Sequence, residues 1–373
     1  MVGGGAGSGK SEVIRVLAQW CQLILQQSGD DPNCPHVLLG APTGTAAANI
    51  RGLTAHKLFD LKFGNEFTNM ADKTRDERRH QMKQLRVLIL DEVSMFSADI
   101  MYKIDKRLRE LMMCNKPYGN ISLFLFGDVC QLQPIMAVHV FDKPKNPDYW
   151  LDYASGVGWQ SNTVVLLEEN HRQAEDKDYA DMLGRFRFGR QTEEDIALLQ
   201  TRVRPEKHPD LQGGTYVFGT NSKAIALNKA RLAKLPGQAE TFISVNIHPT
   251  IAIFDPPIDN KENVKNTNFQ KILILKVNAR VKLTWNVDTA DCLTNGIPGE
   301  VKAFHRNADG KVQYIMVLFD QPHQGAELRE RHPGLAARYP GCTPVEKILV
   351  DYWLGKNKKA VARQAKVFQY PLW

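Results

Sequence analysis

Short apolar runs alternate with amphipathic segments through the first half of the chain. Four of these runs contain no charged residue, as is typical of strands buried on both faces of a parallel sheet; they are 37–39, 87–90, 121–126 and 164–167. Between them, apolar residues recur at helical spacing, as at Ile100, Ile104, Leu108 and Leu111. This alternation predicts an α/β fold in which helices cover both faces of a parallel sheet.

Helical spacing also follows a glycine-rich stretch near the N-terminus. We expect a helix from Ser11 onward, with an apolar face formed by Val13, Val16, Leu17, Trp20 and Ile24. The segment 65–84 is polar and dense in charge, which predicts a small surface subdomain or a helical pair. Phe59 and Phe63 precede this segment and Phe67 lies within it; stacking on bases or a strand-separating wedge is an alternative for these rings, but core packing is favoured.

The pattern changes near residue 174, where we expect a second domain to begin. Helical stretches lead to a strand at 215–218 and a helix at 222–235, and strands then dominate. The later predicted strands are 272–275, 279–284, 299–304 and 312–319. The turn Asp309-Gly310 joins the last two as a hairpin.

We therefore divide the chain into two predicted domains. The first covers 1–173 and carries a small insertion at about 57–86. The second covers 174–373 and carries a β-rich insertion at about 300–365.

A phosphate-binding motif, G-x-x-x-x-G-K-[ST], directly precedes the first predicted helix. It consists of Gly4, Gly5, Ala6, Gly7, Ser8, Gly9, Lys10 and Ser11. The glycines allow positive φ and a close approach to a phosphate chain, Lys10 can reach the β- and γ-phosphates, and the Ser11 hydroxyl can bind Mg²⁺. A chance match in a chain of this length is expected on the order of one time in a hundred. The motif therefore predicts a nucleoside triphosphate site.

Polar residues follow the carboxyl ends of the predicted strands, where open α/β sheets bind ligands. Asp91 and Glu92 fit a Walker B pair, in which Asp91 holds Mg²⁺ opposite Ser11 and Glu92 polarises the attacking water. Gln131 follows the next strand and can sense the γ-phosphate, and Arg172 follows the fourth and can stabilise the transferring phosphoryl group. Each alone is also typical of a solvated surface. Together with the phosphate loop, they predict hydrolysis of a nucleoside triphosphate.

The composition says little about which class of molecule the protein binds. The 373 residues have a net charge of +7 and a pI near 9.0, which permit a polyanionic partner but also suit a solvated basic surface. Six scattered cysteines without a C-x-x-C pair indicate reduced thiols of an intracellular protein. No apolar run has the length of a membrane span, and no signal peptide is evident. A basic run near the C-terminus, which we interpret as a solvated face, contains Lys356, Lys358, Lys359, Arg363 and Lys366.

The order and spacing of these motifs resemble those of the PIF (petite integration frequency) family of superfamily 1B DNA helicases, which includes the helicases of Helitron-type transposons. The resemblance lies in the phosphate loop and in 41–56, 90–95, 127–134 and 169–173, and in the second half in 219–221, 275–283 and 293–301. It implies two RecA-like P-loop NTPase domains with ATP between them. It also implies 5′→3′ movement along single-stranded DNA.

The resemblance further implies roles for individual residues. Lys10 and Ser11 would bind ATP and Mg²⁺, Asp91 and Glu92 would serve hydrolysis, and Gln131 and Arg172 would sense the γ-phosphate. The DNA-contacting segment contains Thr43, Thr54 and His56, with Asn221 as a weaker candidate from the second domain. The implied partners are single-stranded and forked or duplex DNA, with no membrane. We expect a monomer in the nucleus, with the mitochondrion as the alternative.

Two departures from the family pattern qualify this prediction. Only Met1, Val2 and Gly3 precede the loop, where the family has a buried strand. At the other end, 363–373 resembles the lead-in to the family's last two motifs, and the sequence stops before either of them. We therefore expect a fragment truncated at both ends, with an incomplete second domain. The alternatives are a non-catalytic remnant that binds single-stranded DNA, or another P-loop ATPase. The pathway (telomere maintenance, mitochondrial DNA, repair, recombination or transposition) stays open.

Overall fold

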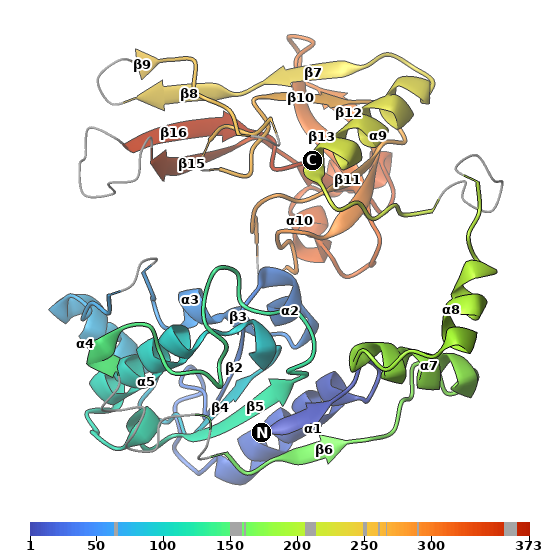
Figure 1. Cartoon of the computed structure of the whole chain (residues 1–373). Helices are drawn as coiled ribbons and strands as arrows, with labels where there is room; N and C mark the ends of the chain where they lie inside the picture. Colours follow the sequence, from blue (N-terminus) through green and yellow to red (C-terminus); the bar gives the residue numbers. More distant parts are fainter. Residues whose placement is uncertain are drawn as a thin grey trace. The chain divides into compact units, whose positions relative to one another are not determined.

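The chain folds into two compact units, Met1–Pro205 and Glu206–Trp373 (Figure 1). The computed structural model describes residues 1–62, 66–149, 159, 162–205, 214–248, 252–259, 262–265, 267–288, 291–353 and 364–373. Among the helices of these residues, none combines the length and the hydrophobicity that a membrane span requires.

The first unit is built on a six-stranded parallel sheet with the strand order β3-β2-β4-β5-β1-β6. The strands are β1 (Val2–Gly4), β2 (Val37–Ala41), β3 (Leu53–Thr54), β4 (Val87–Leu90), β5 (Ser122–Gly127) and β6 (Val165–Leu167). The four predicted strands are confirmed. Although we expected the strand before the phosphate loop to be nearly absent, three residues form it, and they pair with β5 on one side and β6 on the other.

Helices cover both faces of this sheet, as the alternating pattern predicted. On β4, Val87 and Ile89 belong to the core under α1 (Lys10–Leu25) and α2 (Gly44–Asn49). Leu88 and Leu90 point to the opposite face, into the core under α3 (Ala55–Leu58) and α5 (Ala98–Met112). Because side chains alternate along a strand, an uninterrupted apolar run fills both cores. Short 3₁₀ turns complete the unit at Val93–Met95, Pro117–Asn120 and Pro147–Tyr149.

The buried face of α1 differs from the predicted one. Trp20 and Ile24 are 65% and 72% exposed, whereas Ile14 is fully buried. The residues that pack with Ile14 against the sheet are Leu17, Ala18, Cys21 and Leu25. The helix carries two apolar stripes at helical spacing, and sequence periodicity could not distinguish which one faces the sheet.

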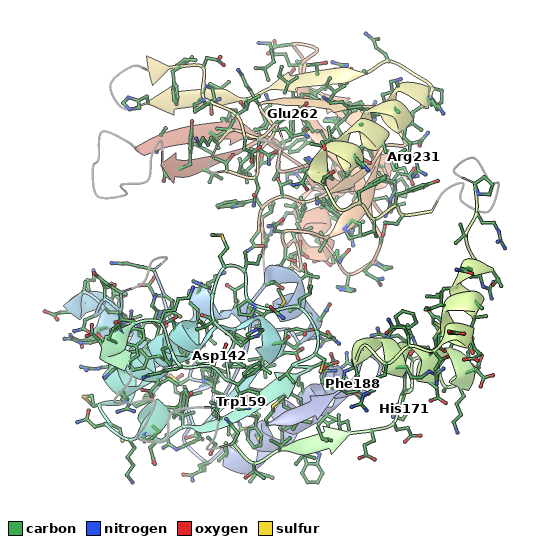
Figure 2. The ribbon with its side chains drawn as sticks, in the orientation of Figure 1. Asp142, Trp159, His171, Phe188, Arg231 and Glu262 are labelled. Atoms are coloured by element: carbon green, nitrogen blue, oxygen red, sulfur yellow. The ribbon has the colours of Figure 1, made fainter. Side chains whose placement is uncertain are left out.

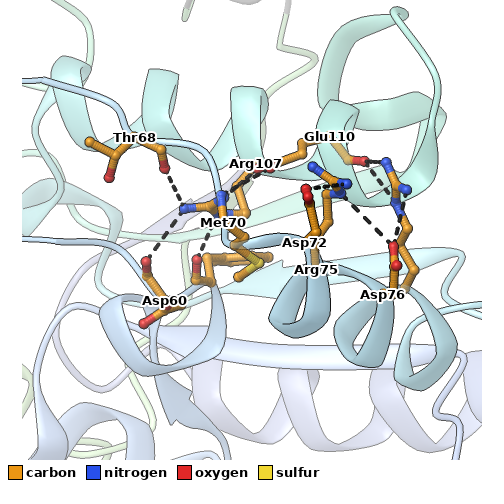
Figure 3. Close-up of polar contacts among 10 residues, drawn as sticks. Asp60, Thr68, Met70, Asp72, Arg75, Asp76, Arg107 and Glu110 are labelled. Carbon is orange, nitrogen blue, oxygen red and sulfur yellow. Dashed lines mark hydrogen bonds and ion pairs between the residues drawn. The ribbon is translucent and has the colours of Figure 1, made fainter.

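The predicted insertion after α3 contains one described helix, α4 (Asp72–Gln81), and it is tied to α5 by a buried arginine (Figure 3). Arg107 donates from Nε to the Phe59 carbonyl at 3.0 Å and from Nη2 to the Thr68 carbonyl at 3.0 Å. It also pairs with Glu110, which accepts a hydrogen bond from the Met70 amide at 3.0 Å. These bonds satisfy loop groups that would otherwise be buried without partners.

The three phenylalanines of this region have different surroundings. Phe59 is fully buried in the core, as the favoured interpretation predicted. The ring of Phe67 lies 4.9 Å from the guanidinium carbon of Arg107. Phe63 lies outside the described residues.

The first unit extends further along the chain than the boundary expected near 174. It includes α7 (Lys177–Arg187) and α8 (Glu193–Gln200), which are joined by an ion pair between Arg185 and Asp195. Arg187 at the end of α7 pairs with Asp128, which follows β5. These contacts connect the helices to the sheet of the first unit, and a boundary taken from the change of sequence pattern does not register them.

Every strand pair named for the second unit is antiparallel. The strands are β7 (Glu240–Ile243), β8 (Val245–His248), β9 (Ala252–Ile253), β10 (Ile272–Leu275), β11 (Arg280–Lys282), β12 (Pro298–Arg306), β13 (Val312–Phe319), β14 (Thr343–Val345), β15 (Ile348–Trp353) and β16 (Gln364–Gln369). They form sheets of order β10-β7, β11-β12-β13-β14 and β15-β16-β8-β9. The helices are α9 (Asn221–Lys234), α10 (Ala326–Arg331) and α11 (Pro333–Arg338).

Several predictions for this half are confirmed and one is wrong. The hairpin of β12 and β13 turns at Gly310, where φ is +75°. Strands dominate from Glu240 onward, whereas the sequence pattern placed the first of them at 272 and the β-rich insertion at about 300–365. The segment 215–218 forms no strand, and Val217 in it is 93% exposed. Among the described residues no neighbouring strand pairs with it, so its apolar pattern is not sufficient to form a ladder. The basic run falls outside the described residues except for Lys366 in β16.

Candidate functional site

The strand order brings the predicted phosphate-site residues to one edge of the sheet. The phosphate loop follows β1, Asp91 follows β4, Gln131 follows β5 and Arg172 follows β6. These four strands are consecutive neighbours in the order β4-β5-β1-β6. Because they are parallel, their carboxyl ends lie at the same edge. Residues as far apart in the sequence as Lys10 and Arg172 therefore meet there.

The phosphate loop is held in shape by its own hydrogen bonds. Gly7 and Gly9 have φ of +84° and +82°, which a residue with a side chain rarely adopts. The Lys10 ammonium donates to the carbonyls of Gly4 and Gly5 at 2.8 and 2.9 Å. Ser11 stands in the first turn of α1, with its side chain exposed.

The segment after β6 lies directly against this loop. A Cβ built on Gly7 would be 2.5 Å from Asn170 Oδ1 and 2.6 Å from Arg172 Cβ, so only glycine fits there. The amide of His171 donates to the Gly7 carbonyl at 2.9 Å. Asn170 was not predicted as a site residue; its Oδ1 accepts from the Arg172 amide at 3.0 Å and so fixes the turn that brings Arg172 to the loop.

Of the two carboxylates of the predicted Walker B pair, Asp91 is buried and Glu92 is half-buried. Asp91 is 6% exposed, and burial raises its pKa against the opposing effects of the hydrogen bond from the Glu92 amide and the charge of Lys10. Burial also raises the pKa of Glu92, and the neighbouring Asp91 charge adds to the shift. The Glu92 backbone adopts φ 52° and ψ 47°, in the left-handed region. Strain of this kind in a residue other than glycine is typical of functional sites.

The pKa of Lys10 reflects the charged groups that surround it in this site. Burial lowers the pKa of its ammonium, while the carboxylates of Asp128, Glu92 and Asp91 oppose the shift, in decreasing order. A half-buried cation and a glycine cradle fit a triphosphate. The oxygen donors Ser11 and Asp91 suit Mg²⁺, which prefers hard oxygen ligands.

Two further residues of this site were not predicted. Asp128 is 2% exposed, and its Oδ1 accepts from the Cys130 amide at 3.0 Å and from Arg187 Nε at 3.2 Å. Its Oδ2 accepts from the Gln131 side-chain amide at 3.3 Å. Arg187 lies 59 positions further along the chain, so no local pattern connects it to Asp128. The stretches that reach the loop from β6 and α7 can be followed in Figure 2, where His171 and Phe188 are labelled.

The candidate DNA-binding residues of the first unit lie at the same sheet edge. Thr43 follows β2 and caps α2, its Oγ1 accepting from the Ala46 amide at 3.2 Å. Thr54 ends β3 and caps α3, its Oγ1 accepting from the Lys57 amide at 3.4 Å. Burial and the charge of Lys103 lower the pKa of His56, which favours the neutral imidazole. Both threonines thus have a structural reason for their side chains in addition to the predicted one.

A pocket of about 200 Å³ joins the two groups of candidates. It is lined by Thr43, Thr45, Ala46, Asn49, Glu92, Ser94, Met95, Gln131 and Leu132. The Ser94 hydroxyl is buried and has no hydrogen-bond partner among the described residues. Such a group in a polar pocket indicates a place for water or a polar ligand atom. Asn221, the remaining DNA candidate, begins α9 in the second unit and is exposed.

A separate cluster in the first unit carries possible metal ligands. The ligand atoms of Asp31, Cys34 and His80 lie within 4.8 Å of one another. However, the Asp31 carboxylate already pairs with the Lys83 ammonium at 3.1 Å, and burial raises the pKa of the Cys34 thiol. A metal would have to displace the ammonium and deprotonate the thiol, so we assign no metal to this cluster.

Solved helicase structures share this fold. The structure of Pif1 helicase from Candida albicans matches all of this chain and 79% of that chain, with a TM-score of 0.69 and 23% sequence identity. The structure of Bacteroides Pif1 bound to single-stranded DNA matches all of this chain and 76% of that chain, with a TM-score of 0.67 and 20% identity. At this level of identity, the likeness establishes the fold.

Curated relatives and a family model extend the comparison. "ATP-dependent DNA helicase PIF1" of Emericella nidulans is 28% identical over 357 residues, which are 92% of this chain and 45% of the relative. The human protein of the same name is 28% identical over 83% of this chain and 45% of its own length. The chain thus spans about half the length of these relatives. A model for PIF1-like helicases matches residues 1–195, more than half of the chain, from the phosphate loop to α8. This chain belongs to the PIF1-like helicase family.

Proposed function

We propose that this chain is the motor of an ATP-dependent DNA helicase, which hydrolyses ATP with Mg²⁺, moves 5′→3′ along single-stranded DNA and unwinds duplex or forked DNA. The observation that carries the proposal is the meeting of the phosphate loop, Asp91, Gln131 and Arg172 at the carboxyl ends of four adjacent strands. The names of the curated relatives support the same activity. We place the protein inside the cell as a monomer acting on nuclear or mitochondrial DNA.

Each side chain has a part in holding or activating the nucleotide. The glycine loop and Lys10 hold the triphosphate, and Ser11 and Asp91 hold Mg²⁺, which supplies neutralising charge when bound. Glu92 orients and polarises the attacking water; the burial that raises the pKa of its carboxyl also makes it a stronger base. Gln131 and Arg172 stabilise charge on the transferring phosphoryl group.

Coupling to DNA follows from the shared sheet edge. Thr43, Thr54 and His56 bind the DNA backbone through hydroxyl and imidazole groups without reading sequence, and Asn221 adds a contact from the second unit. The pocket supports this coupling, because Thr43, which we propose to contact DNA, lines the same cavity as Glu92 and Gln131, which we propose to serve hydrolysis. A shift of the α2 cap on DNA binding would therefore reach the groups that position water.

The decisive experiment measures the steady-state ATPase rate of the whole chain with and without an oligo-dT strand. We expect DNA to stimulate turnover, and Lys10→Ala or Glu92→Gln to abolish it, by at least about a hundredfold. Glu193→Gln, an exposed carboxylate at the start of α8, is the matched control and leaves the rate unchanged.

The other outcomes identify the alternatives. DNA binding that weakens steeply with salt, without any turnover, would point to a remnant that only binds single strands. ATP hydrolysis that is indifferent to DNA would point to a different kind of P-loop ATPase. Either result overturns the proposed motor activity.

A further inference from the structure

The ion pair between Asp128 and Arg187 stands at the nucleotide site, and the proposed hydrolysis assigns no role to either residue. The Asp128 side chain is 1% exposed and that of Arg187 is 31% exposed. Arg187 directs both Nε and Nη2 to the same oxygen, Oδ1. Its other terminal nitrogen, Nη1, lies 3.9 Å from where a Cβ on Gly5 would stand, so the guanidinium lies next to the phosphate loop.

Asp128 connects three parts of the site. One of its oxygens holds the side-chain amide of Gln131, and the other accepts from the Cys130 amide as well as from Arg187. Of the carboxylates around Lys10, Asp128 raises the pKa of the ammonium the most. A buried, uncompensated carboxylate at this place would attract Lys10 and repel an incoming triphosphate.

We propose that Arg187 is a positioning residue of the nucleotide site, because its guanidinium neutralises the charge of Asp128. The neutralised carboxylate can then hold Gln131 without drawing Lys10 away from the triphosphate and without repelling the triphosphate. The inference rests on the proposed ATP-binding function and deepens it. It assigns to the end of α7 a role in nucleotide affinity, which no motif in the sequence marks.

Helix α7 provides its own control. Arg185, two positions earlier, makes an equivalent pair with Asp195, from Nε to Oδ2 at 2.7 Å and from Nη2 to Oδ1. That pair fastens α7 to α8, and its acceptor belongs to α8 rather than to the nucleotide site. A general loosening of α7 would follow from losing either arginine, whereas a charge effect on the nucleotide would follow only from losing Arg187.

The test is equilibrium binding of a fluorescent ATP analogue with Mg²⁺ to the whole chain, together with KM and kcat for ATP at saturating oligo-dT. We expect Arg187→Met to raise Kd and KM about tenfold, because it leaves a buried charge unpaired. Arg185→Met leaves both unchanged. Asp128→Asn lowers kcat, since asparagine has only one acceptor oxygen for the donors of Cys130, Gln131 and Arg187, and it leaves Kd within about threefold of the wild type.

The double variant Arg187→Met/Asp128→Asn gives the signature of charge neutralisation. Removing the carboxylate should restore Kd to within about threefold of the single Asp128→Asn chain, since no charge then remains to be compensated. A purely structural role predicts that the double variant binds at least as weakly as Arg187→Met. If Arg187→Met melts below the assay temperature, Arg187→Gln keeps one donor for Asp128 but no charge, and the same loss and recovery are expected.

Three results would overturn the proposal: wild-type affinity in Arg187→Met, no recovery in the double variant, or an equal loss in Arg185→Met. Its failure can be told apart from failure of the helicase function. The helicase function fails when DNA does not stimulate wild-type turnover, whereas the role of Arg187 is read from ratios of Kd, which need no DNA. A wild-type chain that binds no ATP analogue overturns both.

Discussion

At the scale of single residues, Glu92 shows how this site stores unfavourable energy. Its backbone is left-handed and its carboxyl lies beside Asp91 in a partly buried place, so that burial and like charge both raise its pKa. A carboxyl whose pKa is raised by folding contributes stability below its ordinary pKa of 4.5 and loses it as pH rises through the raised value. The group that we assign to water activation therefore destabilises the folded chain at neutral pH.

Glu92→Gln should accordingly separate stability from activity. We expect its Tm at pH 8 to exceed that of the wild type, and the difference to shrink as pH falls toward 4.5, where wild-type Glu92 becomes neutral too. Thermal melts across this pH range provide the measurement. Glu110→Gln is the control, since this carboxylate is paired with buried Arg107 and its loss should lower Tm. A lower Tm for Glu92→Gln at pH 8 would contradict the assignment.

Gly7→Ala tests the close approach of the segment after β6. Both Gly7 and Gly29 have positive φ, of +84° and +92°, so alanine costs about 1–2 kcal/mol of backbone strain at either position. At Gly7 the new methyl group would also meet Asn170 and Arg172, whereas nothing lies within 4 Å at Gly29. We expect Gly7→Ala to weaken binding of a fluorescent ATP analogue at least about tenfold, while Gly29→Ala leaves it unchanged. Equal affinities in the two variants would show that the loop tolerates the displacement.

At the scale of elements, the sequence predicted the positions of the strands of the first unit better than it predicted which face of a helix is buried. An uninterrupted apolar run such as that of β4 is too short for a buried helix and fits a strand buried on both faces, and this strand was confirmed. Helix α1 carries two apolar stripes, and which of them packs depends on the sheet, which a local pattern does not contain. The segment 215–218 shows the same limit for strands, since pairing needs a neighbour that periodicity cannot provide.

Two substitutions in α1 test its observed orientation. Ile14→Ala should lower the free energy of unfolding by about 2–5 kcal/mol, because it removes a fully buried side chain. Trp20→Gln, on the other stripe, should change it by no more than about 0.5 kcal/mol, because Trp20 is 65% exposed. Urea titrations followed by circular dichroism compare the two. If Trp20→Gln lowers the free energy of unfolding by more than this amount, the stripe that contains Trp20 is covered in solution.

At the scale of the whole molecule, sequence motifs named the members of the site, and the sheet brought them together. Lys10 and Asp91 belong to patterns with fixed local spacing, so each could be found without a structure. Arg187 and Asn170 could not, since they reach the loop only through the fold. The assigned roles of all of these residues stay predictions until the variants above are measured.

Separate cores predict separate unfolding. Ile14 packs in the first unit and Leu283 in a core of the second, and both are fully buried. We expect calorimetry to resolve two transitions, with Ile14→Ala lowering one and Leu283→Ala lowering the other. If both variants shift a single transition equally, the two units unfold as one cooperative block.

The three-residue strand β1 has a mechanical consequence. It is held by β5 on one side and β6 on the other, and the phosphate loop begins at its last residue. Because β1 pairs with both neighbours, a displacement of the phosphate loop would be transmitted through β1 to its two flanking strands. Those strands lead into Gln131 and Arg172, which would make loss of the γ-phosphate a movement shared by three neighbours rather than a local event.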